Sequence, residues 1–319
     1  MENINTKVLT ALQSKDLDFD VVMREAYTLM NGVPTPNGKF NPVRVDADGK
    51  ESLLSGIGFS KDFTPIQNRD AFTVIGDIAE ISDIDLVNVG SWGNGAGVFA
   101  QINLGDMLVA GSDKVGKYLS IVNSHNGSRG FSALITPYRY FCSNQISASL
   151  NDARRNGTII SLRHSSDVDA RMKELTMALK TSNEAFDRAL ISYEKLAGKV
   201  ITAGDIRQVL AQVFPFDPNV GQRGNNAWQR RIEAVVDRFN DADNGRAEKM
   251  TAWNLYNAVQ GSIQHGARKT SSYEESVLMG DIAHKSTEAL KIVEMVTLDG
   301  YTYEVAPEFD RVFSKMAVA

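Results

Sequence analysis

Two pairs of carboxylates are the residues of this chain whose spacing comes closest to catalytic chemistry. Asp83 and Asp85 flank one residue, as do Asp167 and Asp169, and such pairs can bind Mg²⁺ through their oxygens. The first pair precedes a predicted strand, and the second begins a predicted helix, where the helix dipole favours acidic side chains. A structural role is therefore the favoured interpretation. A metal-dependent nuclease is kept as an alternative, because two-metal hydrolysis needs carboxylates that converge on one pocket.

The other residue types that commonly do chemistry are scattered. None of the histidines has a second histidine or a cysteine at metal-ligand spacing; they are His125, His164, His265 and His284. His125 falls in a predicted turn and is expected to be a turn or surface residue. Apolar neighbours predict that the single cysteine, Cys142, is a buried structural thiol. The glycine-rich stretch at 93–97 lies between two predicted strands, which favours a hairpin over a dinucleotide site. The sequence thus predicts no catalytic residue, no metal ion and no cofactor.

The distribution of charge points to a polyanion instead. The net charge is −5, yet residues 114–180 hold ten Lys/Arg against four Asp/Glu, a local excess of six, between two acidic ends. Phosphate binding needs such cations along a track, and base stacking needs aromatic faces beside it. The residues predicted to contact phosphate are Lys114, Lys117, Arg129, Arg139, Arg154, Arg155 and Arg163, and those predicted to stack on bases are Tyr138 and Tyr140. Two alternatives stay open: the cations are a chance cluster on a solvated surface, and the tyrosines pack against the C-terminal helices.

Hydrophobic spacing predicts the elements that would position these residues. The N-terminal part should hold helices over 3–13, 20–30 and 67–80, a strand over 39–45, and a segment at 53–60 that pairs with it. Period-two alternation then predicts a β-meander of four or five strands over 85–136, with strands at 85–91, 97–104, 108–111, 116–123 and 129–136. Two Asn-Gly turns lie between those strands, since a type I′ turn needs positive φ at both central positions. A helix over 140–150 and a strand over 157–163 should follow.

From residue 167 the sequence favours helices almost to its end. They are expected over 167–196, 202–213, 227–239, 251–264 and 273–296, with Thr202 as an N-cap and with Trp253 and Tyr256 in the helical core. The predicted fold class is α+β, with an antiparallel meander flanked by helices and then a mainly helical half. The natural boundary near 165–169 divides the chain into an α+β domain, 1–166, and a helical domain, 167–319.

Several features favour a cytoplasmic protein. One cysteine permits no internal disulfide, which suits a reducing compartment. No apolar run approaches the roughly 18 residues that a transmembrane helix needs. The first residues also lack the basic-then-apolar order of a signal peptide.

Five stretches resemble a phage- and plasmid-like protein family of unknown function. They are Phe63–Phe72, Asn123–Ser128, Thr136–Gln145, Ile160–His164 and Thr251–Val259, in the same order, and they span about residues 40–297. The resemblance implies that the chain originates from a mobile genetic element. It implies no activity, since the family has none that could be carried over.

A looser resemblance concerns the order of the predicted elements. A helix at 67–80, the meander at 85–136 and a helix at 140–150 are similar in order to the core of Rad52-type single-strand annealing proteins. Those proteins form rings and hold single-stranded DNA in a basic groove, and phages use such proteins in recombination. This is an analogy of fold, and no motif carries over residue by residue.

These observations together predict a phage-type protein that binds and anneals single-stranded DNA in recombination, without catalysis. It would act as a homo-oligomer, with a ring as one arrangement, in the cytoplasm of the host cell. The alternative is a phage- or plasmid-encoded interaction protein that inhibits a host defence enzyme, because acidic surfaces can mimic nucleic acid.

Overall fold

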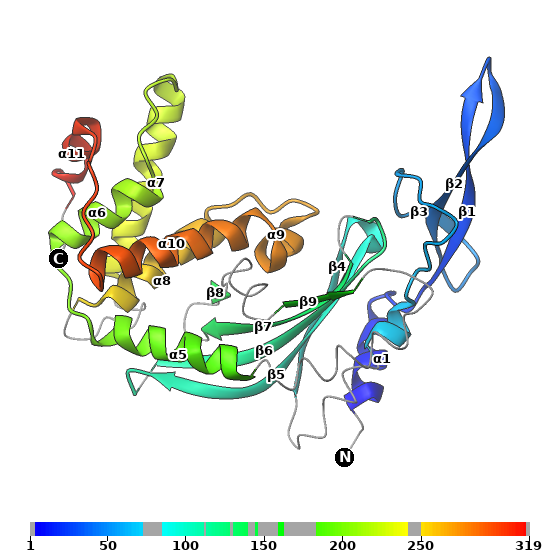
Figure 1. Ribbon diagram of the computed structural model, residues 1–319, viewed down its shortest axis with the longest axis horizontal. Coiled ribbons are helices and arrows are strands. Elements are labelled where there is room, and N and C mark those ends of the chain that lie inside the picture. Colours follow the sequence, from blue (N-terminus) through cyan, green and yellow to red (C-terminus); the bar gives the residue numbers. More distant parts are fainter. Residues whose placement is uncertain are drawn as a thin grey trace.

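The computed structural model describes residues 4–72, 85–111, 113–127, 130–139, 144–145, 159–162, 183–241 and 250–316. Two antiparallel sheets form the N-terminal part, and helices form most of the C-terminal half, which confirms the predicted α+β class. The larger sheet lies at the centre, the smaller one projects at one end, and the helices α6, α7 and α11 lie at the other end (Figure 1).

The described N-terminal residues form helix α1, a three-stranded sheet and a helical turn at 68–72, where the sequence predicts a helix over 67–80. Helix α1 spans Ile4–Ser14, and the strands are β1 (Asp20–Met30), β2 (Val33–Val45) and β3 (Glu51–Leu53), in the order β1-β2-β3. The helix predicted over 20–30 is therefore wrong, because β1 pairs with β2 along its length. The physical reason lies in the turn: Asn31 and Gly32 have φ of 53° and 80°, the positive values that a tight hairpin requires. The predicted strand at 39–45 is part of β2.

The central sheet is the predicted meander. It contains β4 (Asp85–Trp92), β5 (Gly97–Val109), β6 (Asp113–Ser124), β7 (Phe131–Arg139) and β8 (Asn144–Gln145) in sequence order, and β9 (Ile159–Leu162) pairs with β7. The segments predicted as separate strands at 97–104 and 108–111 are one strand, whose register shifts between Asn103 and Asp106. Strand β8 lies within the helix predicted over 140–150, so at these two residues that prediction is wrong.

The helical half follows the predicted order closely. Its described helices are α5 (Asn183–Gly198), α6 (Ala203–Val213), α7 (Gln222–Asn240), α8 (Ala252–His265), α9 (Tyr273–Met279), α10 (Asp281–Thr297) and α11 (Pro307–Phe313). Thr202 caps α6 as predicted, in a capping box with Asp205. The helix predicted over 273–296 is interrupted at Gly280, whose φ and ψ of −110° and −148° are not helical.

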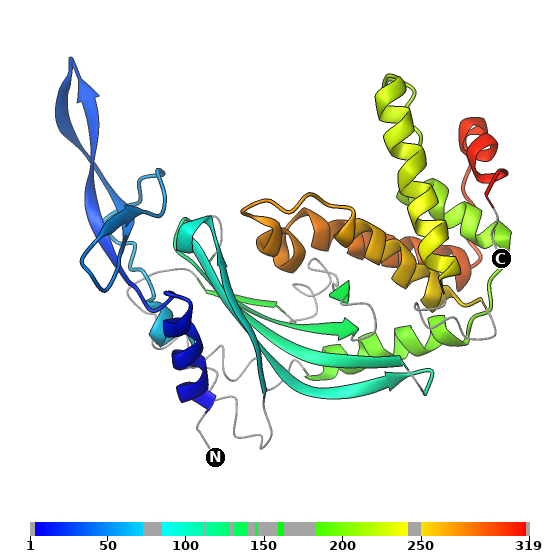
Figure 2. The same ribbon diagram turned by 180° about the vertical axis from the view of Figure 1, so that it is seen from behind.

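Alternating residues of the central sheet contribute to different cores. Val98 and its even-numbered neighbours on β5 pack with α1 and with residues 71 and 72. Phe99, on the opposite face of the same strand, packs with Leu278 and Ala283 of the α9–α10 region. Figure 2 shows the helices α8, α9 and α10 along one side of this sheet and α5 along the other. Both faces of the meander are thus covered, each by different helices.

The largest core joins the helices to one end of the sheet. Trp253 and Tyr256 lie in it, as predicted, with exposed fractions of 2% and 0%. Val109 and Val115 of the sheet belong to the same core, and the Trp253 indole donates a hydrogen bond of 2.6 Å to Asp113. The boundary predicted near 165–169 lies outside the described residues, so the division into two domains stays a prediction.

Candidate nucleic-acid interface

Two of the predicted phosphate-binding residues lie on β6 with their side chains described. Lys114 Nζ lies 2.6 Å from a carboxylate oxygen of Asp106, while about half of its side chain stays exposed. Lys117 is half-buried. Strand β6 is regular between them, so residues three apart point to opposite faces of the sheet. These two lysines therefore do not share one surface.

The structure says less about the other seven predicted contacts. The backbones of Tyr138 and Arg139 lie in β7, opposite Gly116 and Val115. Arg129, Tyr140, Arg154, Arg155 and Arg163 lie outside the described residues, as do Cys142, His164, Asp83 and the pair at 167 and 169. The basic block stays a prediction. Among the described residues, no group of three or more His, Cys, Asp or Glu could hold a metal ion.

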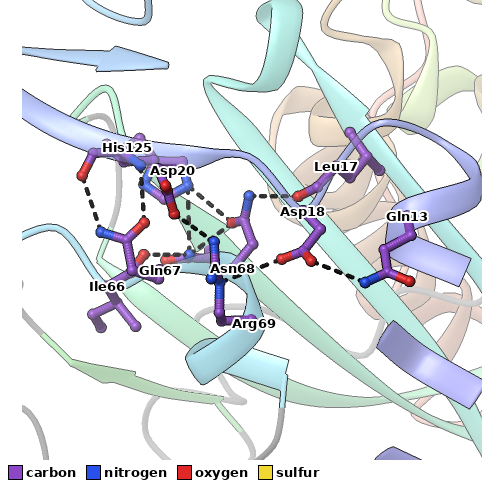
Figure 3. A network of polar contacts seen from close by, with 11 residues as sticks. Gln13, Leu17, Asp18, Asp20, Ile66, Gln67, Asn68, Arg69 and His125 are labelled. Atoms are coloured by element: carbon purple, nitrogen blue, oxygen red, sulfur yellow. Dashed lines mark hydrogen bonds and ion pairs between the residues drawn. The ribbon is translucent and has the colours of Figure 1, made fainter. Parts of the chain in front are cut away.

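Two of the family-like stretches meet in a buried polar network at the base of the small sheet (Figure 3). The Asn68 amide nitrogen donates to the Leu17 carbonyl at 2.9 Å, which directs the Asn68 Oδ1 toward the central sheet. That oxygen accepts hydrogen bonds from Asn123 Nδ2 at 3.0 Å and from His125 Nε2 at 2.9 Å. Because an amide oxygen only accepts, His125 must carry a hydrogen on Nε2.

His125 corrects one expectation from the sequence. Its exposed fraction is 0%, so it is not a surface residue, although it directly follows β6 at the start of the turn. The ring lies edge-on to Phe19, with ring centroids 6.0 Å apart. The period-two pattern located the turn correctly. It could not show that the elements around residues 19 and 68 fold over that turn and bury it.

Residues next to Asn68 hold strand β1 against this network. The Gln67 side chain accepts from the Val21 N–H at 2.8 Å and donates to the Val21 carbonyl at 2.9 Å, as a neighbouring strand would. Arg69 forms ion pairs with Asp18 and Asp20 on either side of Phe19. This side-chain set fixes the N-terminal sheet to the central sheet and has the character of a structural joint.

A cavity of about 610 Å³ with basic side chains on its rim lies among the C-terminal helices. Helices α6, α7, α8 and α10 form its walls. The apolar part of the lining includes Val213, Phe214, Ala234, Ile263, Ile282, Ala289 and Ile292, and the rim carries Arg230, Arg231, His284 and Lys285. We call this cavity the helical groove. It has the size of an ordinary small-molecule site.

The cations at the rim of the helical groove differ from Lys114 of the central sheet, which lies beside Asp106. Arg230, Arg231 and Lys285 are exposed, and across the described residues none of them forms an ion pair. The one carboxylate in the lining, Glu288, lies 3.5 Å from Lys291. Within the part of the chain that the structure describes, no carboxylate therefore forms an ion pair with these three rim cations. Sequence reasoning missed this site, and the adjacent pair Arg230-Arg231 on a predicted helix was the signal available.

A buried aromatic cluster of helices α5 and α8 contains two tyrosines whose pKa is raised. The ring centroids of Tyr193 and Trp253 are 4.9 Å apart, and those of Trp253 and Tyr256 are 6.0 Å apart. Burial, followed by the charge of Glu294, raises the pKa of the Tyr193 hydroxyl, and burial raises that of Tyr256 as well. Both hydroxyls therefore stay neutral, whereas a nucleophile or base would need a lowered pKa.

The fold and the groove define an α+β protein with a basic, apolar-floored cavity in its helical half. Residues 58–292 match the family model described as a domain of unknown function (DUF932), and the chain belongs to this family. No curated protein and no solved structure matches the chain. No helix in the described part is both long and apolar enough to cross a membrane.

Proposed function

We propose that this protein is a non-catalytic, single-strand DNA-binding protein of the annealing type that phages use in recombination. One observation carries the proposal: the helical groove combines an apolar floor with cations that form no ion pair with any carboxylate of the described residues. Single-strand binders need both, because the backbone follows positive charge while the bases leave water for apolar and aromatic surface. Phe214 is the aromatic member of the lining.

The proposal assigns a role to each part of the groove. Arg230, Arg231 and Lys285 bind successive phosphates, and one base enters the space between Phe214 and Ile282. The order of a helix and an antiparallel meander supports the annealing class by analogy with Rad52-type proteins, although strand β8 lies where that analogy expects a second helix. The resemblance to phage and plasmid proteins supports action in the cytoplasm of a host cell.

Fluorescence anisotropy with a labelled oligothymidylate tests the proposal. Three phosphate contacts predict a slope of log K against log salt of about −2, since each contact to a single strand contributes about −0.7. Affinity should therefore fall about twentyfold between about 50 and about 200 mM salt. Charge reversal at all three positions (R230E, R231E and K285E together) should abolish binding at the lower salt.

A matched variant separates the groove from the overall charge. K61E, K199E and K315E together change the net charge by the same amount at exposed positions that do not line the groove. This variant should retain binding. Absence of binding by the unaltered protein at about 50 mM salt overturns the function. Equal loss in both variants overturns the groove as its location.

One observation favours a second function, inhibition of a host defence enzyme by nucleic-acid mimicry. A cavity of about 580 Å³ beside α1 is lined by Asp16, Asp18, Asp46 and Asp48, with Arg44 as its one cation. A surface of this sign would attract the DNA-binding face of another protein. Pull-down from host lysate tests it, and recovery of nucleic acid without a protein partner counts against it.

A further inference from the structure

The hairpin of β1 and β2 projects from the body of the molecule (Figures 1 and 2). Its outer part, residues 26–38, contains no charged residue. Several of its large side chains are exposed, including Tyr27 at 56%, Leu29 at 72% and Met30 at 61%. A projecting two-stranded ribbon is only marginally stable by itself in water. The outer hairpin therefore has the features of a segment that another surface covers.

The register of the hairpin gathers its apolar residues on one face. Tyr27 lies directly opposite Pro36, and Leu29 directly opposite Pro34. Directly opposite residues share a face, and residues two apart on one strand share it too. These four side chains thus form one continuous and largely apolar face, which ends at the Tyr27 hydroxyl, bonded to Glu25 at 2.9 Å. Across the described residues no other element covers Tyr27 or Leu29.

The two edges of the outer hairpin differ chemically. In a hairpin with a two-residue turn, the residues of the closing pair, Met30 and Val33, direct their N–H and C=O groups toward each other. The residues of the next pair, Leu29 and Pro34, therefore direct theirs to the outside of the hairpin. Pro34 and Pro36 of β2 therefore direct nitrogens without hydrogen away from β1, and at these positions the edge cannot donate to another strand. On the opposite edge, Tyr27 and Leu29 of β1 direct complete N–H and C=O groups away from β2.

The edge of β1 is closed at its base and open toward its tip. At Val21 the Gln67 amide forms both hydrogen bonds that a neighbouring strand would form. Across the described residues, no group accepts from or donates to the outward backbone of Tyr27 and Leu29. Proteins usually guard an open edge with lysine or another charge, and the outer hairpin has none.

We propose that the chain self-associates through this edge, with β1 of one copy pairing antiparallel with β1 of a second copy. A two-fold axis makes an open edge complementary to itself, and the two apolar faces then join into one. The blocked edge of β2 limits growth to a four-stranded sheet. A membrane surface is a poorer occupant, because residues 26–38 offer no Lys or Arg to anionic lipid headgroups.

Analytical ultracentrifugation of the full chain, without nucleic acid, tests the proposal. The unaltered protein should sediment as a dimer that dissociates on dilution. Leu29→Pro removes one outward donor from each copy and spares the bonds within the hairpin, so the dissociation constant should rise at least about tenfold. Leu29→Asp places a charge on the apolar face and should weaken association by a similar factor. Leu108→Asp, at an exposed leucine of another strand, is the matched control and should leave the dimer unchanged.

Each outcome decides the proposal. If the protein is still a monomer at a concentration of about 100 μM, its dissociation constant is too high for a specific dimer, and the proposal is overturned. Loss of the dimer in Leu29→Asp but not in a folded Leu29→Pro means that the faces stack without edge pairing, which overturns the pairing. If circular dichroism shows that Leu29→Pro does not fold, an unchanged dimer in Leu29→Asp overturns the proposal instead. The groove variant with three charge reversals should still dimerise, so this test can fail independently of DNA binding.

Discussion

Replacement of Asn68 by alanine is the most informative test of the buried joint. The change removes a donor from the Leu17 carbonyl and an acceptor shared by Asn123 and His125, all at full burial or close to it. Each buried polar group that loses its partner costs about 1–3 kcal/mol. Asn123 keeps its bond of 2.9 Å to the Ile66 carbonyl, so its loss is only partial. We therefore expect the free energy of unfolding to fall by about 3–5 kcal/mol in total.

That cost is large beside the free energy of unfolding of an ordinary domain, about 5–15 kcal/mol. Urea unfolding followed by tryptophan fluorescence and by far-ultraviolet circular dichroism measures it. Asn68→Asp keeps the shape but places a buried carboxylate against the Leu17 carbonyl oxygen, so it should cost at least as much as Asn68→Ala. Asn219→Ala is the surface control, because Asn219 is exposed and bonds to the neighbouring Asp217, and it should stay within about 0.5 kcal/mol. If Asn68→Ala costs no more than Asn219→Ala, the network does not hold the two sheets together.

Three further predictions follow from particular contacts. Thr202→Ala removes the N-cap of α6 and should lower the free energy of unfolding by about 1 kcal/mol in the same urea assay. Gly97→Ala should destabilise the sheet strongly and lower the melting temperature, because a Cβ there would overlap the Trp92 ring. The hydrogen bond from Arg207 lowers the pKa of Asp310, so the pair stabilises the fold above the ordinary aspartate pKa of about 3.9 and loses this effect as the pH falls below it. Asp310→Asn should flatten that acid-side decline in a pH series of thermal melts.

The sequence predicted the central sheet well because its evidence is local. Period-two alternation and the Asn-Gly turns each depend on a few adjacent residues, and β4 to β7 appear where those patterns place them. The prediction for the N-terminal hairpin was wrong because it, too, used only local evidence. Val21 and Val22, followed by Tyr27 and Leu29, fit a helical spacing as well as an extended one. The pairing partner that decides between them, β2, is a property of the tertiary fold.

The helical groove was beyond sequence reasoning for a different reason. Its cations come from α7 and α10, more than fifty positions apart, and the region from residue 181 onward is slightly acidic overall. A search for a run of basic residues therefore favours 114–180. The structure shows that Lys114 of that run lies beside Asp106, while Arg230, Arg231 and Lys285 keep their charge toward solvent. Local charge after folding decides binding, and composition along the chain is a weak guide to it.

The family match separates the two proposals in a useful way. Residues 58–292 contain the helical groove and the joint residues Gln67, Asn68, Arg69, Asn123 and His125, whereas the hairpin at 20–45 precedes the matched region. The DUF932 region thus carries both the candidate DNA site and most of the joint. The hairpin that the joint holds carries the candidate self-association edge. Variants of the hairpin should therefore change assembly and leave the intrinsic affinity of one groove for a short oligonucleotide unchanged. A variant of the joint should instead disturb assembly through the base of β1, because Gln67 and Asn68 hold that strand against the sheet.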